Sequence, residues 1–249
     1  MIPPLVNELL ESWLNWIYPP ACAACGAEME SAAIPLCEPC LHFMTRLRPP
    51  VCALCGAPLE IDAAPPCPNC PDAKPAYACA RSVLSYDDDR ARNAIHALKF
   101  HYQKTLSLPL GRLLYIGWDY YYREVLFDAL VPVPLHKQRR REREFNQSTL
   151  LCEVLSSFCR IPVREDLVFR IRKTIPQTKL DFKIRQKNLI GAIQPASGDA
   201  ARNMSLLIVD DVMTTGATVN EVAAALKKGG AKKIAVLTLA RAPRKAFST

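Results

Sequence analysis

Residues 206–219 read LLIVDDVMTTGATV, and this stretch decides the fold. The four apolar residues 206–209 are too few for a helix and are typical of a strand buried in a parallel sheet. The strand ends on Asp210 and Asp211, and a turn of small residues leads through Gly216 into a helical pattern that ends at residues 229–230. Backbone N–H groups and the positive end of a helix converge in such a loop. The sequence therefore predicts an anion site in an α/β fold.

The residues around this loop favour a phosphate that is joined to a group with hydroxyls. Ionised Asp210 and Asp211 are pure acceptors, with room for two sugar O–H donors. Gly216 lets the backbone approach the ligand closely. A 5′-phosphate joined to a ribose diol is a phosphoribose. The alternative interpretation is an ordinary core strand that ends in two solvated aspartates.

The same stretch resembles the phosphoribosyl-pyrophosphate (PRPP) motif of type I phosphoribosyltransferases. The resemblance implies that Asp210 and Asp211 hold the ribose hydroxyls and that Mg²⁺ accompanies PRPP. It also implies a cradle for the 5′-phosphate, formed by Met213, Thr214, Thr215, Gly216, Ala217 and Thr218. With the cysteine repeats and basic motifs described below, the whole chain resembles the ComF family of competence-associated proteins.

Length and composition set the limits of the fold. A chain of 249 residues has room for one medium domain and a small one, and a hydrophobic fraction of 50% is typical of a globular protein. No apolar run approaches the ~18 residues of a membrane span, and the N-terminus lacks the features of a signal peptide. Eleven cysteines beside a nucleotide-type motif favour bound metal over disulfides. We therefore expect a cytoplasmic protein without a membrane span.

Residues 3–17 predict an amphipathic helix, and we assign residues 1–20 to this N-terminal segment. Leu5, Leu9, Trp13 and Trp16 recur at helical spacing and form a broad apolar face. Packing against the rest of the chain is the favoured interpretation. A role at a membrane surface is the alternative, although the polar face has no basic residue to attract anionic lipid.

Two cysteine repeats predict a double zinc ribbon over residues 21–75. Both have the spacing CxxC-x11-CxxC, and their flanks match as CAACGAEME and CALCGAPLE. Four thiolates complete a tetrahedral shell without an open position, so we expect two structural Zn²⁺ sites. The ligands are Cys22, Cys25, Cys37, Cys40, Cys52, Cys55, Cys67 and Cys70. Ligands grouped by repeat are favoured, and an interleaved arrangement stays open.

Strand and helix patterns alternate through residues 76–249, which we assign to a second domain. Strands are expected at 76–86, 128–135, near 168, at 206–209 and at 232–239, and helices at 87–100, within 106–126, at 146–158 and from 217. This order predicts a parallel, doubly wound sheet with helices on both faces. Gly111 and Gly117 weaken the helix within 106–126. Cys152 and Cys159 have no CxxC partner and are expected to be core thiols.

The resemblance also implies contacts to pyrophosphate and a mobile flap. The implied residues are Lys99, Val133, Arg139, Arg143, Arg172, Gln177 and Arg185. A solvated position at the end of its helix is the alternative for Lys99. In HKQRRREREFNQ, residues 136–147, Glu144 stands where the family motif has glycine. If that position needs a positive φ, Glu144 is strained or the loop is reshaped.

Charge is concentrated in residues 136–187. This fifth of the chain holds fourteen Lys and Arg against six Asp and Glu, a net charge of +8, which equals that of the whole chain. A solvated basic face is the alternative to a polyanion site. The sequence has neither GxGxxG nor GxxxxGK[ST], which argues against dinucleotide and P-loop sites.

Two classes of function remain open. One is a PRPP-dependent transferase whose acceptor is unknown and for which no general base stands out. The other is a DNA-handling protein that holds single-stranded DNA, and ComF resemblance implies a link to DNA uptake, transformation or utilisation and to uptake or recombination proteins.

Overall fold

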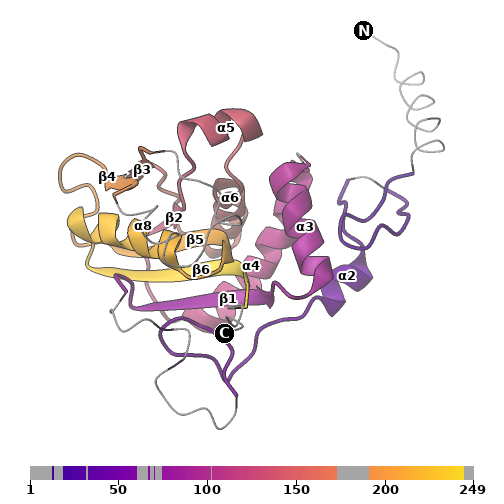
Figure 1. Ribbon diagram of the computed structural model, residues 1–249, viewed down its shortest axis with the longest axis horizontal. Coiled ribbons are helices and arrows are strands. Elements are labelled where there is room, and N and C mark those ends of the chain that lie inside the picture. The colour runs from indigo at the N-terminus through magenta and orange to yellow at the C-terminus, as the bar shows by residue number, and fades with distance from the viewer. Residues whose placement is uncertain are drawn as a thin grey trace, which may run out of the picture.

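The computed structural model describes residues 13, 19–31, 33–60, 67, 70, 75–101, 103–172 and 191–243. Apart from Trp13, the predicted N-terminal helix lies outside these residues, as do Gln177 and Arg185 of the predicted flap. In chain order, the elements in Figure 1 are α2 (Glu38–Phe43), β1 (Cys79–Ser85), α3 (Asp89–Phe100), η1 (Lys104–Leu106), α4 (Ser107–Tyr122), β2 (Ala129–Pro132), α5 (Lys137–Arg143), α6 (Gln147–Cys159), β3 (Val168–Arg170), β4 (Ile193–Pro195), β5 (Ser205–Met213), α8 (Ala217–Lys228) and β6 (Lys233–Arg241).

A four-stranded sheet in the order β1-β6-β5-β2 forms the centre of the fold, and all its strand pairs are parallel. The predicted parallel sheet is therefore confirmed. The strand that opens the decisive stretch, β5, lies between β6 and β2. Ligands of such sheets bind at the carboxyl ends of the strands, so a ligand site is expected at the end of β5.

Both faces of the sheet are covered. Leu207 and Val209 of β5 pack on the side of α3, α4 and α6, whereas Leu206 and Ile208 pack on the side of α8. Figure 1 shows α8 on one side of the sheet and α4 and α6 on the other. Successive strand residues point to opposite faces, so this run is apolar throughout because both of its faces are buried.

The glycines of α4 have a packing role. A Cβ on Gly111 would lie 2.5 Å from Val154 Cγ1 of α6, and a Cβ on Gly117 would lie 2.4 Å from Val83 Cγ2 of β1. These contacts are shorter than carbon atoms tolerate. The two glycines lower the helix propensity of α4 but let it approach α6 and β1, and the predicted helix forms.

The strand near residue 168 differs from the sequence-based expectation. It forms as β3, but it pairs with β4 in an antiparallel arrangement outside the parallel sheet. The position beside β2 is taken by the chain at Val163, which forms a parallel bridge with Leu130. No pattern in the sequence had indicated β4, α2 or α5 as separate elements. Among the described helices, none combines the length and apolar character of a membrane span.

Candidate functional site

Two carboxylates lie near the carboxyl end of β5, and both are buried. Asp210 is 8% exposed and Asp211 is 4% exposed. The Ser148 hydroxyl donates to Asp210 Oδ1 over 3.0 Å, and the backbone N–H of Asp211 donates to the same oxygen over 2.9 Å. Lys99 Nζ lies 2.9 Å from Asp211 Oδ1. The pair is thus held by groups from α3 and α6 as well as by its own backbone.

Burial makes Asp210 a group that titrates near neutral pH. Burial first, and the neighbouring charge of Asp211 second, raise the pKa of Asp210 to about 7. Lys99 and the hydrogen bond from Ser148 oppose this rise but do not cancel it. Asp211 Oδ2 is buried and has no hydrogen-bond partner in the described part of the chain. An acceptor of this kind suits a ligand hydroxyl.

Lys99 reaches this pair from the last turn of α3. Its side chain is 16% exposed and that of Asp211 is 6% exposed, so the ion pair is largely shielded from water. Lys99 is therefore not a solvated lysine at a helix end. Its predicted contact with pyrophosphate stays a prediction.

The predicted phosphate loop follows β5 directly. Gly216 is the N-cap of α8 and has a φ of 79°, a left-handed conformation that favours glycine. A Cβ there would lie 2.7 Å from Met213 Cε and 3.3 Å from the Tyr77 hydroxyl. Thr215 Oγ1 accepts a hydrogen bond of 3.3 Å from the Ala217 N–H. The loop and the first turn of α8, with Thr214 and Thr218, thus form one continuous segment at a helix N-terminus.

Asn146 and Ser148 organise the opposite side of the site. The side chain of Asn146 caps α6 by accepting from the Ser148 N–H over 3.1 Å, and its Nδ2 donates to the carbonyl of Val133 over 3.0 Å. Asn146 therefore ties the loop after β2 to α6, and the cap directs Ser148 towards Asp210. The sequence alone had not indicated Ser148 as a site residue. The pattern that could have indicated it is an N-cap asparagine two residues before a serine at the start of a helix.

The basic stretch after β2 forms α5 and ends in a strained residue. Glu144 follows α5 with φ 62° and ψ −17°, so it has the left-handed conformation that a glycine would adopt easily. Of the two outcomes expected for this position, strain is the observed one. The guanidinium carbon of Arg143 lies 4.7 Å from the ring centroid of Phe100, and its Nη1 donates to Gln147 Oε1 over 3.2 Å. Arg143 thus lies against α3 and α6.

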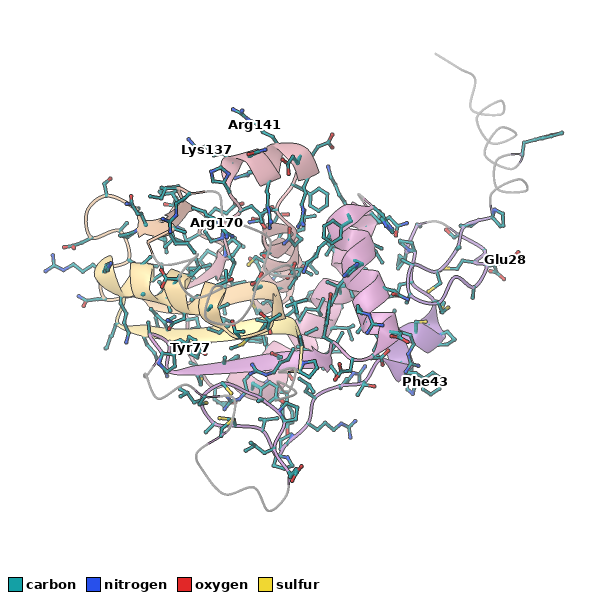
Figure 2. All side chains as sticks on the ribbon, in the orientation of Figure 1. Glu28, Phe43, Tyr77, Lys137, Arg141 and Arg170 are labelled. Atoms are coloured by element: carbon teal, nitrogen blue, oxygen red, sulfur yellow. The ribbon has the colours of Figure 1, made fainter. Side chains whose placement is uncertain are left out.

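Basic side chains surround this corner. Figure 2 shows Lys137 and Arg141 on the outer side of α5. Burial first, and the charge of Arg139 second, lower the pKa of Arg170. The positive charges of Arg139 and Arg170 are therefore close enough to repel each other. Arg172, two residues beyond, is exposed.

The eight repeat cysteines form two separate clusters. In each cluster the four sulfur atoms lie within 4.8 Å of one another, and all eight thiols are free of disulfides. Separations of 3.8 Å for Cys25–Cys37, 3.6 Å for Cys52–Cys70 and 3.8 Å for Cys55–Cys67 match the edge of about 3.8 Å in a tetrahedron with Zn–S bonds of about 2.3 Å. The donors fit structural Zn²⁺, and the ligands group by repeat rather than interleave.

The two clusters lie against different parts of the sheet domain. In the first, the Ala24 carbonyl accepts from Asn93 Nδ2 of α3 over 3.0 Å. In the second, the Cys55 carbonyl accepts from Arg241 Nη1 at the end of β6 over 2.7 Å. Gly26 and Gly56 have φ values of 75° and 67°, as expected for turns that fold back behind the sulfurs.

Comparison with known proteins finds matches to both parts of the chain. A family model described as a double zinc ribbon domain matches residues 13–80, and one described as a phosphoribosyl transferase domain matches residues 168–248. The structure of a purine phosphoribosyltransferase from Pyrococcus horikoshii aligns with a TM-score of 0.33 at 21% identity, over 55% of this chain and 78% of that one. The fold and the two family models define an α/β protein of phosphoribosyltransferase type that carries four-cysteine zinc ribbons.

Two named bacterial proteins have a higher sequence identity to this chain than that phosphoribosyltransferase has. Competence protein F of Haemophilus influenzae is 38% identical over 152 residues, which are 59% of this chain and 66% of that protein. DNA utilization protein YhgH of Salmonella typhimurium is 32% identical over 196 residues, 69% of this chain and 81% of that protein. The chain belongs to the ComF/YhgH family. It spans slightly less than two thirds of the Haemophilus protein.

Proposed function

We propose that this chain binds a phosphoribosyl ligand, PRPP with Mg²⁺ or a close analogue, at the carboxyl end of β5. The buried pair Asp210 and Asp211, next to a helix N-terminus opened by Gly216, is the observation that carries the proposal. The carboxylates supply acceptors for ribose hydroxyls, and the backbone of residues 214–218 supplies donors for the 5′-phosphate. Lys99 adds a positive charge beside the carboxylates. Mg²⁺, when bound with PRPP, would offset the charge of the pyrophosphate.

The experiment is a thermal unfolding titration with PRPP and Mg²⁺. At about 100 times Kd, the ligand should stabilise the folded state by roughly 2.7 kcal/mol. For a chain of this length that amounts to a rise in Tm of roughly 5–10 °C. The double variant Asp210→Asn, Asp211→Asn should lose the response, and ribose 5-phosphate should give part of it in the wild type. A full response in the double variant would show that the ligand binds elsewhere.

We further propose that the biological role is DNA uptake or utilisation, in which the basic surface of α5 holds single-stranded DNA. The names of the relatives support this link, and the charge of residues 136–187 supports a polyanion ligand. α5 carries five basic residues, and its outer side is exposed. α5 itself carries no aromatic residue, so phosphate contacts rather than base contacts should dominate.

A salt titration with a fluorescent oligonucleotide tests the DNA role. Each phosphate that the protein neutralises should contribute roughly 0.7 to the slope of log affinity against log salt. The triple variant Arg139→Ala, Arg141→Ala, Arg143→Ala should weaken binding and flatten this slope.

The matched control removes the same charge from the opposite end of the sheet, where Lys227, Lys228 and Lys232 are exposed near the amino ends of the strands. Their replacement by alanine should leave the slope unchanged. If both triple variants weakened binding equally, the net charge of the protein alone would explain the interaction. Competition between PRPP and the oligonucleotide would indicate a shared groove.

Phosphoribosyl transfer is the second candidate, and the pKa of Asp210 favours it. In such a reaction the bond from ribose C1 to a pyrophosphate oxygen breaks, the bond from C1 to the acceptor forms, and the acceptor loses a proton. A carboxylate with a pKa of about 7 accepts a proton under physiological conditions. Pyrophosphate release, measured with a panel of nucleobases, tests this candidate. Release with one base that Asp210→Asn abolishes would favour the enzyme, and no release with any base would leave the binding role alone.

A further inference from the structure

The geometry points to the second four-cysteine cluster, Cys52, Cys55, Cys67 and Cys70, as the support that positions the phosphate loop. Arg241 and Tyr77 are the positioning residues that connect them. Removal of metal from this cluster should therefore weaken phosphate binding, whereas the first cluster should have little effect. The inference rests on the phosphoribosyl ligand proposed above and extends it to a role for the ribbon.

The first connection runs through Arg241. This arginine is 7% exposed, and its guanidinium donates from Nη1 to the Cys55 carbonyl over 2.7 Å and from Nη2 to Cys55 Sγ over 3.6 Å. Its backbone position on β6 pairs with Met213 on β5, and the Ala242 N–H donates to the Met213 carbonyl over 3.0 Å. Met213 Cε occupies the space beside Gly216. One buried side chain thus links a metal-ligating sulfur to the strand end that begins the loop.

The second connection runs through the residues that follow Cys70. The N–H of Ala76 donates to Asn220 Oδ1 in the first turns of α8 over 2.7 Å. The hydroxyl of Tyr77, which is 7% exposed, lies 3.3 Å from the place that a Cβ on Gly216 would occupy. The phosphate loop and the start of α8 therefore rest on the segment that leaves the second cluster. A shift of this segment removes the packing that holds Gly216 in place.

The second cluster is also fixed to the edge of the sheet. The N–H of Ala80 in β1 donates to the Leu54 carbonyl over 2.8 Å, and a Cβ on Gly56 would lie 2.4 Å from the Ala80 carbonyl oxygen. The first cluster is attached elsewhere: its Ala24 carbonyl accepts from Asn93 on α3, and Cys22 and Cys40 are buried in the core that includes α3. The two clusters have the same internal spacing but different neighbours, which makes each a control for the other.

The experiment compares Cys52→Ser with Cys22→Ser, which change the same position of the two repeats. Each variant should keep about one zinc, which metal analysis verifies. Ribose 5-phosphate is the probe, and calorimetry measures its Kd. Cys52→Ser should raise the Kd for ribose 5-phosphate by about tenfold, which is the middle of the range for contacts that couple two sites. The Kd of Cys22→Ser should stay within about twofold of the wild-type value. Equal losses in the two variants, or no loss in either, would overturn the inference.

A second measurement does not depend on a ligand. Hydrogen exchange of the peptide spanning residues 212–220 should become faster in Cys52→Ser and stay unchanged in Cys22→Ser. Arg241→Met and Tyr77→Ala should accelerate the same peptide with both zincs retained. Tyr77→Phe, which removes only the hydroxyl beside Gly216, should accelerate it to a smaller extent. If the wild type does not bind ribose 5-phosphate or PRPP, the proposed function fails and hydrogen exchange still decides the inference. Unchanged exchange in all of these variants refutes it.

Discussion

Replacing Lys99 by methionine tests whether Lys99 neutralises the buried carboxylates. The variant removes the ammonium group 2.9 Å from Asp211 Oδ1 and keeps a side chain of similar length. It leaves Asp211 with one oxygen that already lacks a hydrogen-bond partner among the described residues, next to Asp210. Breaking a buried ion pair in this way costs about 3–5 kcal/mol.

Lys99→Met should therefore lower the free energy of unfolding by about 3–5 kcal/mol at pH 8. The loss should come from the unpaired charge of Asp211 rather than from lost packing, because methionine keeps most of the length of the lysine side chain.

Urea unfolding of the wild type and the variant at pH 8 measures this loss. Asp211→Asn in the Lys99→Met background removes the charge and should recover most of the loss at pH 8, and the single Asp211→Asn variant completes the double-mutant cycle. A loss that the asparagine does not recover would attribute the effect to packing rather than to charge.

Four further outcomes are expected. Metal analysis should give about two zinc per chain, and fewer than two would contradict a closed shell in each cluster. Glu144→Gly should raise stability by up to about 1 kcal/mol in thermal unfolding because it relieves the positive φ, whereas Glu144→Ala should not. The pKa of Asp210 is about 7 in the folded state and 3.8 in the unfolded state, so the folded state loses stability as pH rises between these values. The stability of Asp210→Asn relative to the wild type should therefore increase from pH 5 to pH 7, by at most about 1.4 kcal/mol per pH unit. Gly216→Ala should cost about 1–3 kcal/mol and exceed the cost of Gly198→Ala, which has a similar φ of 73° but no atom within 4 Å of the new Cβ.

The sequence predicted the parts of this protein whose physics is local. The apolar run before Asp210 is buried on both faces of a parallel sheet, and the cysteine spacing leads to two clusters grouped by repeat. Each of these patterns specifies its own structure. Even the strain at Glu144 followed from one residue that differs from a motif.

Contacts between distant segments could not be predicted. Lys99 lies more than one hundred residues from Asp211 in the chain, and no periodicity indicates which carboxylate it meets. Arg241 reaches Cys55 across an even longer separation. The placement of β3 depends on which segment borders β2, and a three-residue strand has too little pattern to decide that. Such pairings depend on the assembled fold rather than on local sequence.

The strand order has a consequence for biosynthesis. The last strand of the sheet in the chain, β6, lies in its interior between β1 and β5. Until residues 233–241 have emerged from the ribosome, β1 has no partner strand in this sheet and β5 is paired only with β2. The cysteine repeats are made first and can fold around metal long before that point. During synthesis β1 and β5 would expose open hydrogen-bonding edges, which other chains can pair with. A ribosome that stalls shortly before residue 233 should therefore carry a metal-loaded ribbon followed by an aggregation-prone nascent segment.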